Sequence, residues 1–151
     1  MDSIDIQILE CLKKNARENA SSISAKINLS VSAVIERIKK LESGGMIRQY
    51  SILLDYGKID MGILAFISVG IEHPKYNEAF RATVLNMRQI VECHYVTGDL
   101  DYLLKVVASS TQDLEHVLDA IKAIKGVSAT KTMVVFSTVK NDLCVLPEKT
   151  S

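Results

Sequence analysis

Apolar residues recur at helical spacing in the first third of the chain and alternate along strands in the remainder. Val34, Ile38 and Leu41 fall at i, i+4 and i+7, which predicts an amphipathic helix with one buried stripe. Ser30 precedes this helix as an N-cap, because its hydroxyl can accept from the free amides of the first turn. The glycine pair 44–45 ends the helix, since glycine adopts a left-handed conformation without a Cβ penalty.

Two more helices are predicted before this one. Residues 1–15 form the first, capped by Asp2 or by the serine that follows it. The second is shorter, begins at a serine cap within residues 21–22 and runs to Ile27. Asn28 then tolerates the left-handed backbone of a tight turn. Helix, short helix, turn and longer helix is the spacing of a helix-turn-helix, in which the third helix reads DNA.

The segment 46–54 is rich in residues that favour strands, and we expect it to be extended, as a wing and then a connector. Glycine and aspartate concentrate between residues 55 and 62, which indicates a domain boundary. The expected organisation is a DNA-binding domain over 1–50, an extended linker over 51–62, a second domain over 63–140 and a C-terminal tail over 141–151.

In the second domain the apolar pattern predicts the order βαββαβ, the ferredoxin-like arrangement of a four-stranded antiparallel sheet with two helices on one face. The fold class is therefore α+β, a winged helix-turn-helix joined to a ferredoxin-like domain. The expected strands are 63–72, 90–97, 101–108 and 127–138, and the expected helices are 76–84 and from Ser110 or Thr111 to just before Gly126.

Both faces of this predicted sheet are apolar. In the first strand Ile67 lies on one face and Phe66 on the other, and in the last strand Val134 and Met133 divide in the same way. Two helices can cover only one face, so a second copy of the chain is expected to cover the other. The sequence predicts a homodimer that forms by packing of sheets.

Composition excludes several classes of protein. With 48% hydrophobic and 24% charged residues the chain is globular and not disordered. Its net charge is zero, and residues 1–60 hold nine Lys/Arg against eight Asp/Glu, so any affinity for DNA depends on where charges lie. The three cysteines have no metal-ligand spacing, and we expect no metal or cofactor. No signal peptide or membrane span is evident, so a cytoplasmic location is expected.

Several short motifs occur in a fixed order along the chain, and together they resemble the Lrp/AsnC family of transcription regulators. The resemblance covers nearly the whole sequence. The family's turn glycine is Asn28 here, and its usual Ser-Pro-Thr helix start is replaced by residues 30–32. The matching residues are Asp2, Asp5, Ile8 and Leu9 at the start; Leu29-Ser30, Arg37-Ile38, Leu41-Glu42, Gly45, Ile47 and Tyr50 around the third helix; and Val96 to Tyr102, Gly126-Val127 and Thr132 later.

This resemblance implies a sequence-specific regulator that binds double-stranded DNA as a homodimer, with dimers often assembling to octamers. The second domain would be of the RAM type and would hold a small-molecule effector, an amino acid or a related compound, between dimers. No membrane contact is implied. Because a dimer carries two reading helices, pseudo-palindromic DNA sites are expected.

The residues predicted to face DNA lie on the polar side of the third helix and at its start. Ser30 is first a cap, and the amides beside it are placed to meet a phosphate. Arg37 borders the apolar stripe, so an internal salt bridge or a phosphate contact is as plausible as base reading. The predicted set is Ser30, Ser32, Ala33, Glu36, Arg37, Lys39 and Lys40.

The predicted effector site is the loop between the second and third strands of the second domain. Its plain alternative is a hairpin turn, in which Gly98 and Asp99 serve only the backbone. A hydroxyl and carboxylates can hold an ammonium group, while exposed amides can hold a carboxylate, which fits an amino acid. The predicted set is Thr97, Gly98, Asp99, Asp101, Tyr102 and Thr132.

Two other functions compete with a ligand-responsive regulator. Some proteins with the same two-domain layout are sirohaem decarboxylases, and His94-Tyr95 is a pair suited to acid–base chemistry on a propionate. Few basic residues lie near that strand to hold a polycarboxylate, so we expect no enzyme. A DNA-compacting architectural protein is the third possibility, and the zero net charge argues against it.

Overall fold

The computed structural model describes residues 1–148 and divides the chain into two units. The first unit holds Met1–Leu53 with the described residues from Lys140 onward, and the second holds Leu54–Val139. The predicted tail over 141–151 falls in the first unit up to Glu148, and its last three residues lie outside the described part of the chain.

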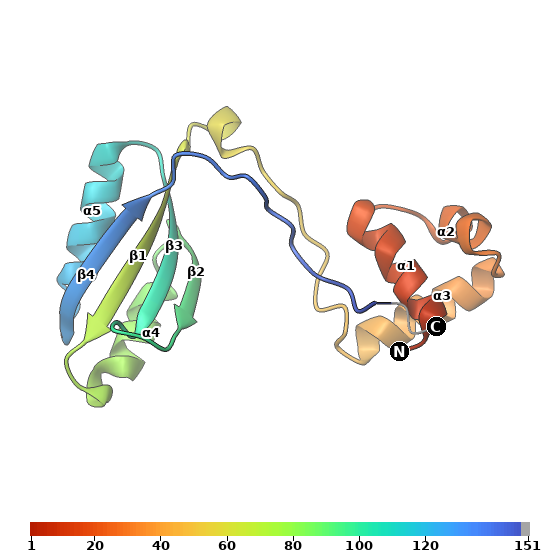
Figure 1. The fold of residues 1–151 in the computed structure, drawn as a ribbon, viewed down its shortest axis with the longest axis horizontal. Coiled ribbons are helices and arrows are strands. Elements are labelled where there is room, and N and C mark those ends of the chain that lie inside the picture. Colours follow the sequence, from red (N-terminus) through yellow and green to blue (C-terminus); the bar gives the residue numbers. More distant parts are fainter. Residues whose placement is uncertain (149–151) are drawn as a thin grey trace. The chain divides into compact units, whose positions relative to one another are not determined.

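The first unit is built on three helices, α1 (Ser3–Lys14), α2 (Ala20–Ile27) and α3 (Val31–Ser43). Figure 1 shows the three helices grouped together. Their apolar faces meet in a small core, as the periodicity predicts. The buried members of that core are Ile8, Leu12, Ile23, Val34 and Leu41.

Local capping sets the helix ends. Asp2 accepts from the backbone N–H of Asp5 at 2.9 Å, and the Asp5 carboxylate accepts from the Asp2 N–H at 3.0 Å, which completes a capping box. The second helix is capped by Asn19, whose side chain accepts from Ser22 N–H at 2.8 Å, and not by a serine within 21–22. That prediction was wrong by two or three residues, because both residue types make good caps. Asn28 has φ 54°, the left-handed turn expected before α3.

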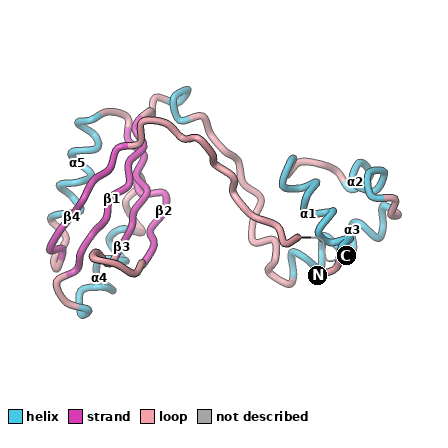
Figure 2. Tube along the Cα trace, viewed as in Figure 1, coloured by secondary structure: helices cyan, strands magenta, loops and turns pink. Residues whose placement is uncertain are grey.

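The segment after α3 is neither helix nor strand in this chain, as Figure 2 shows over residues 46–54. A wing strand needs a hydrogen-bonded neighbouring strand. Among the described residues, the segment predicted as the wing is not assigned to such a pair. Tyr50 is instead held by its side chain, whose hydroxyl donates to Glu42 Oε1 at 2.8 Å. The expected extended linker contains one short 3₁₀ helix, Tyr56–Ile59.

The second unit has the predicted βαββαβ order. Its four strands form one antiparallel sheet in the order β2-β3-β1-β4, and Figure 1 shows α4 and α5 against the sheet. The elements are β1 (Ile63–Ile71), a 3₁₀ turn (Pro74–Tyr76), α4 (Asn77–Val84), β2 (Ile90–Tyr95), β3 (Tyr102–Ala108), α5 (Thr111–Lys122) and β4 (Val127–Val134).

Strand register places the apolar core on the face that the two helices cover. Ile67 of β1 pairs with Leu104 of β3 and with Thr132 of β4. The neighbouring position, Phe66, pairs with Lys105 and Met133 and lies on the opposite face. The buried residues are Ala65, Ile67, Val69, Phe80, Val84, Tyr102, Leu104, Val106, Ala108, Leu114, Val117 and Ile121.

Two strand ends differ from the sequence prediction by two or more residues. Strand β2 stops at Tyr95 because the chain turns into the loop at Val96, whose N–H donates to the Asp101 carbonyl at 2.9 Å. Strand β4 stops at Val134 although apolar residues continue to Phe136. Val135 N–H still donates to the Leu64 carbonyl at 2.8 Å, but β1 begins at Ile63, so little of that strand remains for the chain to pair with.

Candidate functional site

The N-terminal end of α3 is well defined by its cap. The Ala33 N–H donates to Ser30 Oγ at 3.3 Å, and the hydroxyls of Ser30 and Ser32 lie 3.2 Å apart. The capping role of Ser30 is therefore confirmed, and Ser32 stands exposed beside it. The first turn presents hydroxyls and backbone amides to solvent, which is the chemistry that a phosphate or a base edge requires.

Further along α3 the outward face carries charge. Glu36 and Lys40 form an ion pair at 2.9 Å on successive turns, and the hydrogen bond from Lys40 lowers the pKa of the Glu36 carboxyl. Lys39 is also exposed, and no ion pair joins it to any residue between 1 and 148. Lys39 is therefore available to a phosphate, whereas Lys40 must first give up its ion pair with Glu36.

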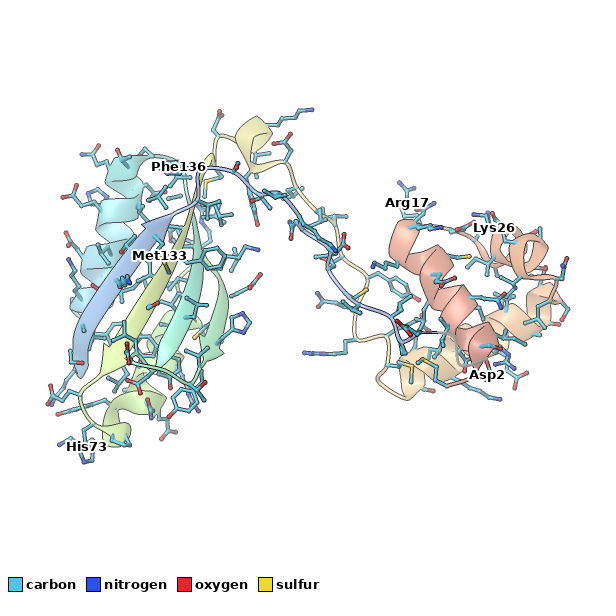
Figure 3. All side chains as sticks on the ribbon, in the orientation of Figure 1. Asp2, Arg17, Lys26, His73, Met133 and Phe136 are labelled. Atoms are coloured by element: carbon cyan, nitrogen blue, oxygen red, sulfur yellow. The ribbon has the colours of Figure 1, made fainter. Side chains whose placement is uncertain are left out.

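Arg37 is occupied within the protein. Its Nη1 lies 2.8 Å from Asp2 Oδ2 and 2.7 Å from Asp5 Oδ1, so the side chain joins α3 to the start of α1. Asp2 is labelled at that end of α1 in Figure 3. The hydrogen bonds that Arg37 donates to Asp2 and then to Asp5 raise the pKa of the guanidinium. Of the alternatives that the sequence left open, the internal salt bridge is formed, and base reading by Arg37 stays a prediction.

Two polar clusters of the first unit were not predicted from the sequence. Glu18 accepts from Ser22 Oγ at 2.7 Å and pairs with Lys26, which ties the chain before α2 to that helix. Burial, followed by the bond to Glu42, raises the pKa of Tyr50 to about 12. The partners in these clusters lie four or eight residues apart in the sequence. Which side chains pair, however, depends on the path of the chain between them.

The predicted effector loop joins β2 to β3. Thr97, Gly98 and Asp99 are exposed, and Gly98 has φ 127°, a conformation that favours glycine. Two hydrogen bonds attach Asp101 to the end of β1. Its backbone N–H donates to the Val69 carbonyl at 2.9 Å, and its Oδ2 accepts from the Ile71 N–H at 2.6 Å. One Asp101 oxygen therefore fixes the loop to the end of β1.

The other two predicted effector residues lie apart from the loop tip. Tyr102 is buried, and its hydroxyl accepts from Arg81 Nε at 2.8 Å and donates to Asn77 Oδ1 at 3.0 Å. Thr132 is on β4, which is separated from β3 by β1. Within one chain the fold brings together Thr97 to Asp101 but does not bring Thr132 to them.

His94 and Tyr95 point to opposite faces of the sheet. His94 Nε2 lies 3.1 Å from Glu92 Oε2, on the face that the helices leave open. Tyr95 stacks on Tyr102 at 5.1 Å between ring centroids, on the covered face. The pair therefore does not converge on one reacting atom.

Metal-ligating side chains do not gather into a site within residues 1–148. Over that range no group of three or more histidine, cysteine, aspartate or glutamate side chains is arranged to hold a metal ion. Among the helices described, none is both long and apolar enough to span a membrane.

Comparison with known proteins places both units in one family. Residues 1–42 match the AsnC-type helix-turn-helix domain, and residues 64–143 match the Lrp/AsnC ligand binding domain. An uncharacterized HTH-type transcriptional regulator of Pyrococcus horikoshii is 35% identical over 95% of this chain and 97% of its own length. The leucine-responsive regulatory protein of Haemophilus influenzae is 34% identical over 93% of this chain and 86% of its own.

Solved structures agree with this assignment. The crystal structure of a transcriptional regulator from Neisseria meningitidis in complex with L-methionine superposes with a TM-score of 0.92 at 32% identity, covering 97% of this chain and 96% of that one. The loop motif from Val96 to Tyr102 falls inside the second matched region, and the two regions cover the helix-turn-helix and the ferredoxin-like sheet to within one residue. The chain belongs to the Lrp/AsnC family of transcription regulators.

Proposed function

We propose that this regulator binds specific double-stranded DNA through the outward face of α3 and that a small molecule modulates the binding. The observation that carries the proposal is the start of α3, where a capped, exposed first turn leads into a row of exposed cationic and polar side chains. The contacting residues are Ser32, Ala33, Glu36, Lys39 and Lys40, with the Ser30 end of the helix on a phosphate.

Lys39 is the sharpest test of this surface. Replacing it with alanine removes one phosphate contact, so we expect weaker binding to all sequences and a salt dependence shallower by about one counterion per bound helix. The measurement is the affinity for one duplex across a series of salt concentrations. Lys26→Ala is the matched control, because Lys26 lies on α2 and already pairs with Glu18. An unchanged salt slope in Lys39→Ala would remove Lys39 from the interface.

The proposed effector is an amino acid or a related compound. Thr97 and the free oxygens of Asp99 and Asp101 suit an ammonium group, and the exposed amides around Gly98 suit a carboxylate. The relative from Neisseria meningitidis crystallised with L-methionine, which supports this class of ligand. Because Thr132 lies away from the loop in one chain, the proposed site takes Thr132 from another copy, at a contact between dimers.

We propose that the chain is a homodimer through the open face of the sheet, and that dimers assemble to octamers. Phe66 and Leu103 are only half buried on that face, and Met133 is 45% exposed. Figure 3 labels Met133 on β4 and Phe136 just beyond its end, where the Phe136 side chain is fully exposed. A monomer mass at micromolar concentration by light scattering would overturn the dimer.

We propose that the chain is not an enzyme and that it acts in the cytoplasm. The divergent His94 and Tyr95 side chains support the first point, since acid–base chemistry needs groups within reach of one substrate. Purified protein that is coloured, or that changes the absorbance of an added tetrapyrrole, would reverse this conclusion.

The deciding experiment is a mobility shift with the DNA upstream of the protein's own gene, against random competitor, with and without a pool of amino acids. A specific shift that one amino acid alters supports both parts of the proposal. A specific shift that no amino acid alters keeps the DNA role and discards the effector loop. The absence of any specific shift at low salt contradicts the proposed DNA interface.

A further inference from the structure

The exposed surface of α3 carries two parallel rows of side chains at four-residue spacing. One row is polar throughout and consists of Ser32, Glu36 and Lys40. The other begins with two apolar residues, Val31 and Ile35, and ends with the cation Lys39. Val31 is 41% exposed and Ile35 is 42% exposed. An apolar pair on this helix is not explained by phosphate binding or by capping.

Neither apolar side chain takes part in the helical core. That core takes Val34 and Leu41 from α3, with Ile38 packed against it, and includes neither Val31 nor Ile35. Valine and isoleucine are also stiff, because branching at Cβ leaves one strongly preferred χ1 rotamer in a helix. Their exposed methyl groups are therefore held in place before any partner arrives, so binding orders little that was mobile.

Resting on the proposed DNA interface, we propose that Val31 and Ile35 read thymine, by packing against the C5-methyl group in the major groove. Thymine is the base that places an apolar group on the major-groove edge, and short apolar side chains are its usual partners. Lys39 lies one turn beyond Ile35 on the same row, where a cation meets the adjacent phosphate. The apolar row thus selects T·A pairs, while the polar row contacts other bases.

The test begins with full-length protein and in vitro selection of bound duplexes from a random library. In the selected site each thymine is then replaced singly by deoxyuridine, which deletes only the methyl group. For the wild-type protein we expect one or two thymines per half-site whose replacement weakens binding about fourfold, the ratio that corresponds to about 0.8 kcal/mol per buried carbon. In Ile35→Ala the thymine whose methyl packs against Ile35 loses this sensitivity, and in Val31→Ala the thymine that packs against Val31 loses it, because the partner of the methyl is gone.

Controls separate loss of thymine reading from general damage. Ile35 is exposed, so Ile35→Ala is expected to keep the wild-type circular dichroism spectrum and unfolding temperature. Ile59→Ala makes the same chemical change at a 47% exposed site outside α3 and should retain full sensitivity to deoxyuridine.

Three outcomes overturn the inference. A selected site at which no deoxyuridine weakens the wild-type protein leaves the DNA interface standing and removes thymine reading. Equal sensitivity of every thymine in wild type, Val31→Ala and Ile35→Ala assigns the methyl contact to other residues. A library that yields no enriched site contradicts the proposed DNA interface, and this inference with it.

Discussion

The helical unit and the sheet unit are held together in different ways. The helical core has five buried residues, and polar contacts such as those of Arg37 with Asp2 and Asp5 also join α3 to the start of α1. The sheet core has twelve buried residues between one face of the sheet and the two helices. The second face carries half-buried apolar residues such as Phe66 beside charged ones such as Lys105. A unit with a small core and a polar outward helix face suits binding to DNA, whereas a unit with a large core and partly exposed apolar residues on its sheet suits assembly.

This comparison predicts that the helical unit tolerates less damage to its core. Ile8 is fully buried between the three helices, and Ile8→Ala should cost about 3–4 kcal/mol. That loss approaches the whole stability expected of a unit of about 50 residues. We expect the variant to lose part of its helical circular dichroism and its specific DNA binding while it keeps the wild-type mass by light scattering. Leu85→Ala, at an 83% exposed site, is the control and should change neither property.

The next largest effect is expected at a glycine of the sheet unit. Gly126 has φ 92°, and a Cβ there would lie 2.3 Å from Tyr76 Cγ. Gly126→Ala should therefore cost about 2–3 kcal/mol in the free energy of unfolding, from backbone strain and overpacking together. Gly45, which follows α3, has φ 71°, and a Cβ there would have nothing within 4 Å, so Gly45→Ala should cost only about 1 kcal/mol.

Chemical denaturation followed by circular dichroism measures both glycine variants. Equal losses in the two would show that the Tyr76 ring moves aside at little cost, and the steric explanation for Gly126 would then be wrong.

The smallest effect concerns the polar contacts of the helical unit. The backbone N–H of Asp5, followed by the Arg37 guanidinium, lowers the pKa of the Asp2 carboxyl from 3.8. Because the folded-state pKa lies below the unfolded value, the stabilisation is fully present above pH about 4 and is lost as the pH falls through the folded-state pKa. Asp2→Asn should lower the unfolding temperature of the helical unit by a few degrees at pH 6, since exposed ion pairs contribute little.

The measurement is the unfolding temperature of Asp2→Asn and wild type from pH 6 down to pH 2. The gap between them should close at the acid end, where Asp2 is protonated in both states. A gap that stays constant over this range would mean that the Asp2 charge does not stabilise the folded unit.

Features that depend on near neighbours were predictable. The caps of α1, α3 and α5, at Asp2, Ser30 and Ser110, involve bonds across three residues and follow from local sequence. The βαββαβ order follows from alternation and helical periodicity. The cap of α2 was predicted wrongly. Asn19 and the serines that follow it are equally good caps, and the path of the chain into α2 determines which of them is used.

The candidate site also contains local features that were predictable and long-range contacts that were not. Its polar row on α3 was predictable because a helix fixes which residues share a face. By contrast, the partners of Arg37 lie more than 30 residues away, and the bond from Ile71 N–H to Asp101 spans 30 residues. Such contacts exist only once helices have docked and strands have taken their register, and several partners of equal chemistry compete for each side chain until then.

By itself the sequence determined the elements, their order and the face that each presents, because these follow from periodicity and bonds within one turn. The tertiary structure decided which polar and charged side chains are paired within the protein and which remain exposed. It bound Arg37 to α1, anchored Asp101 and buried the Tyr102 hydroxyl, while it left Lys39, Val31 and Ile35 open. The physical reason is that burial and pairing depend on packing between segments distant in the chain, which no local pattern encodes.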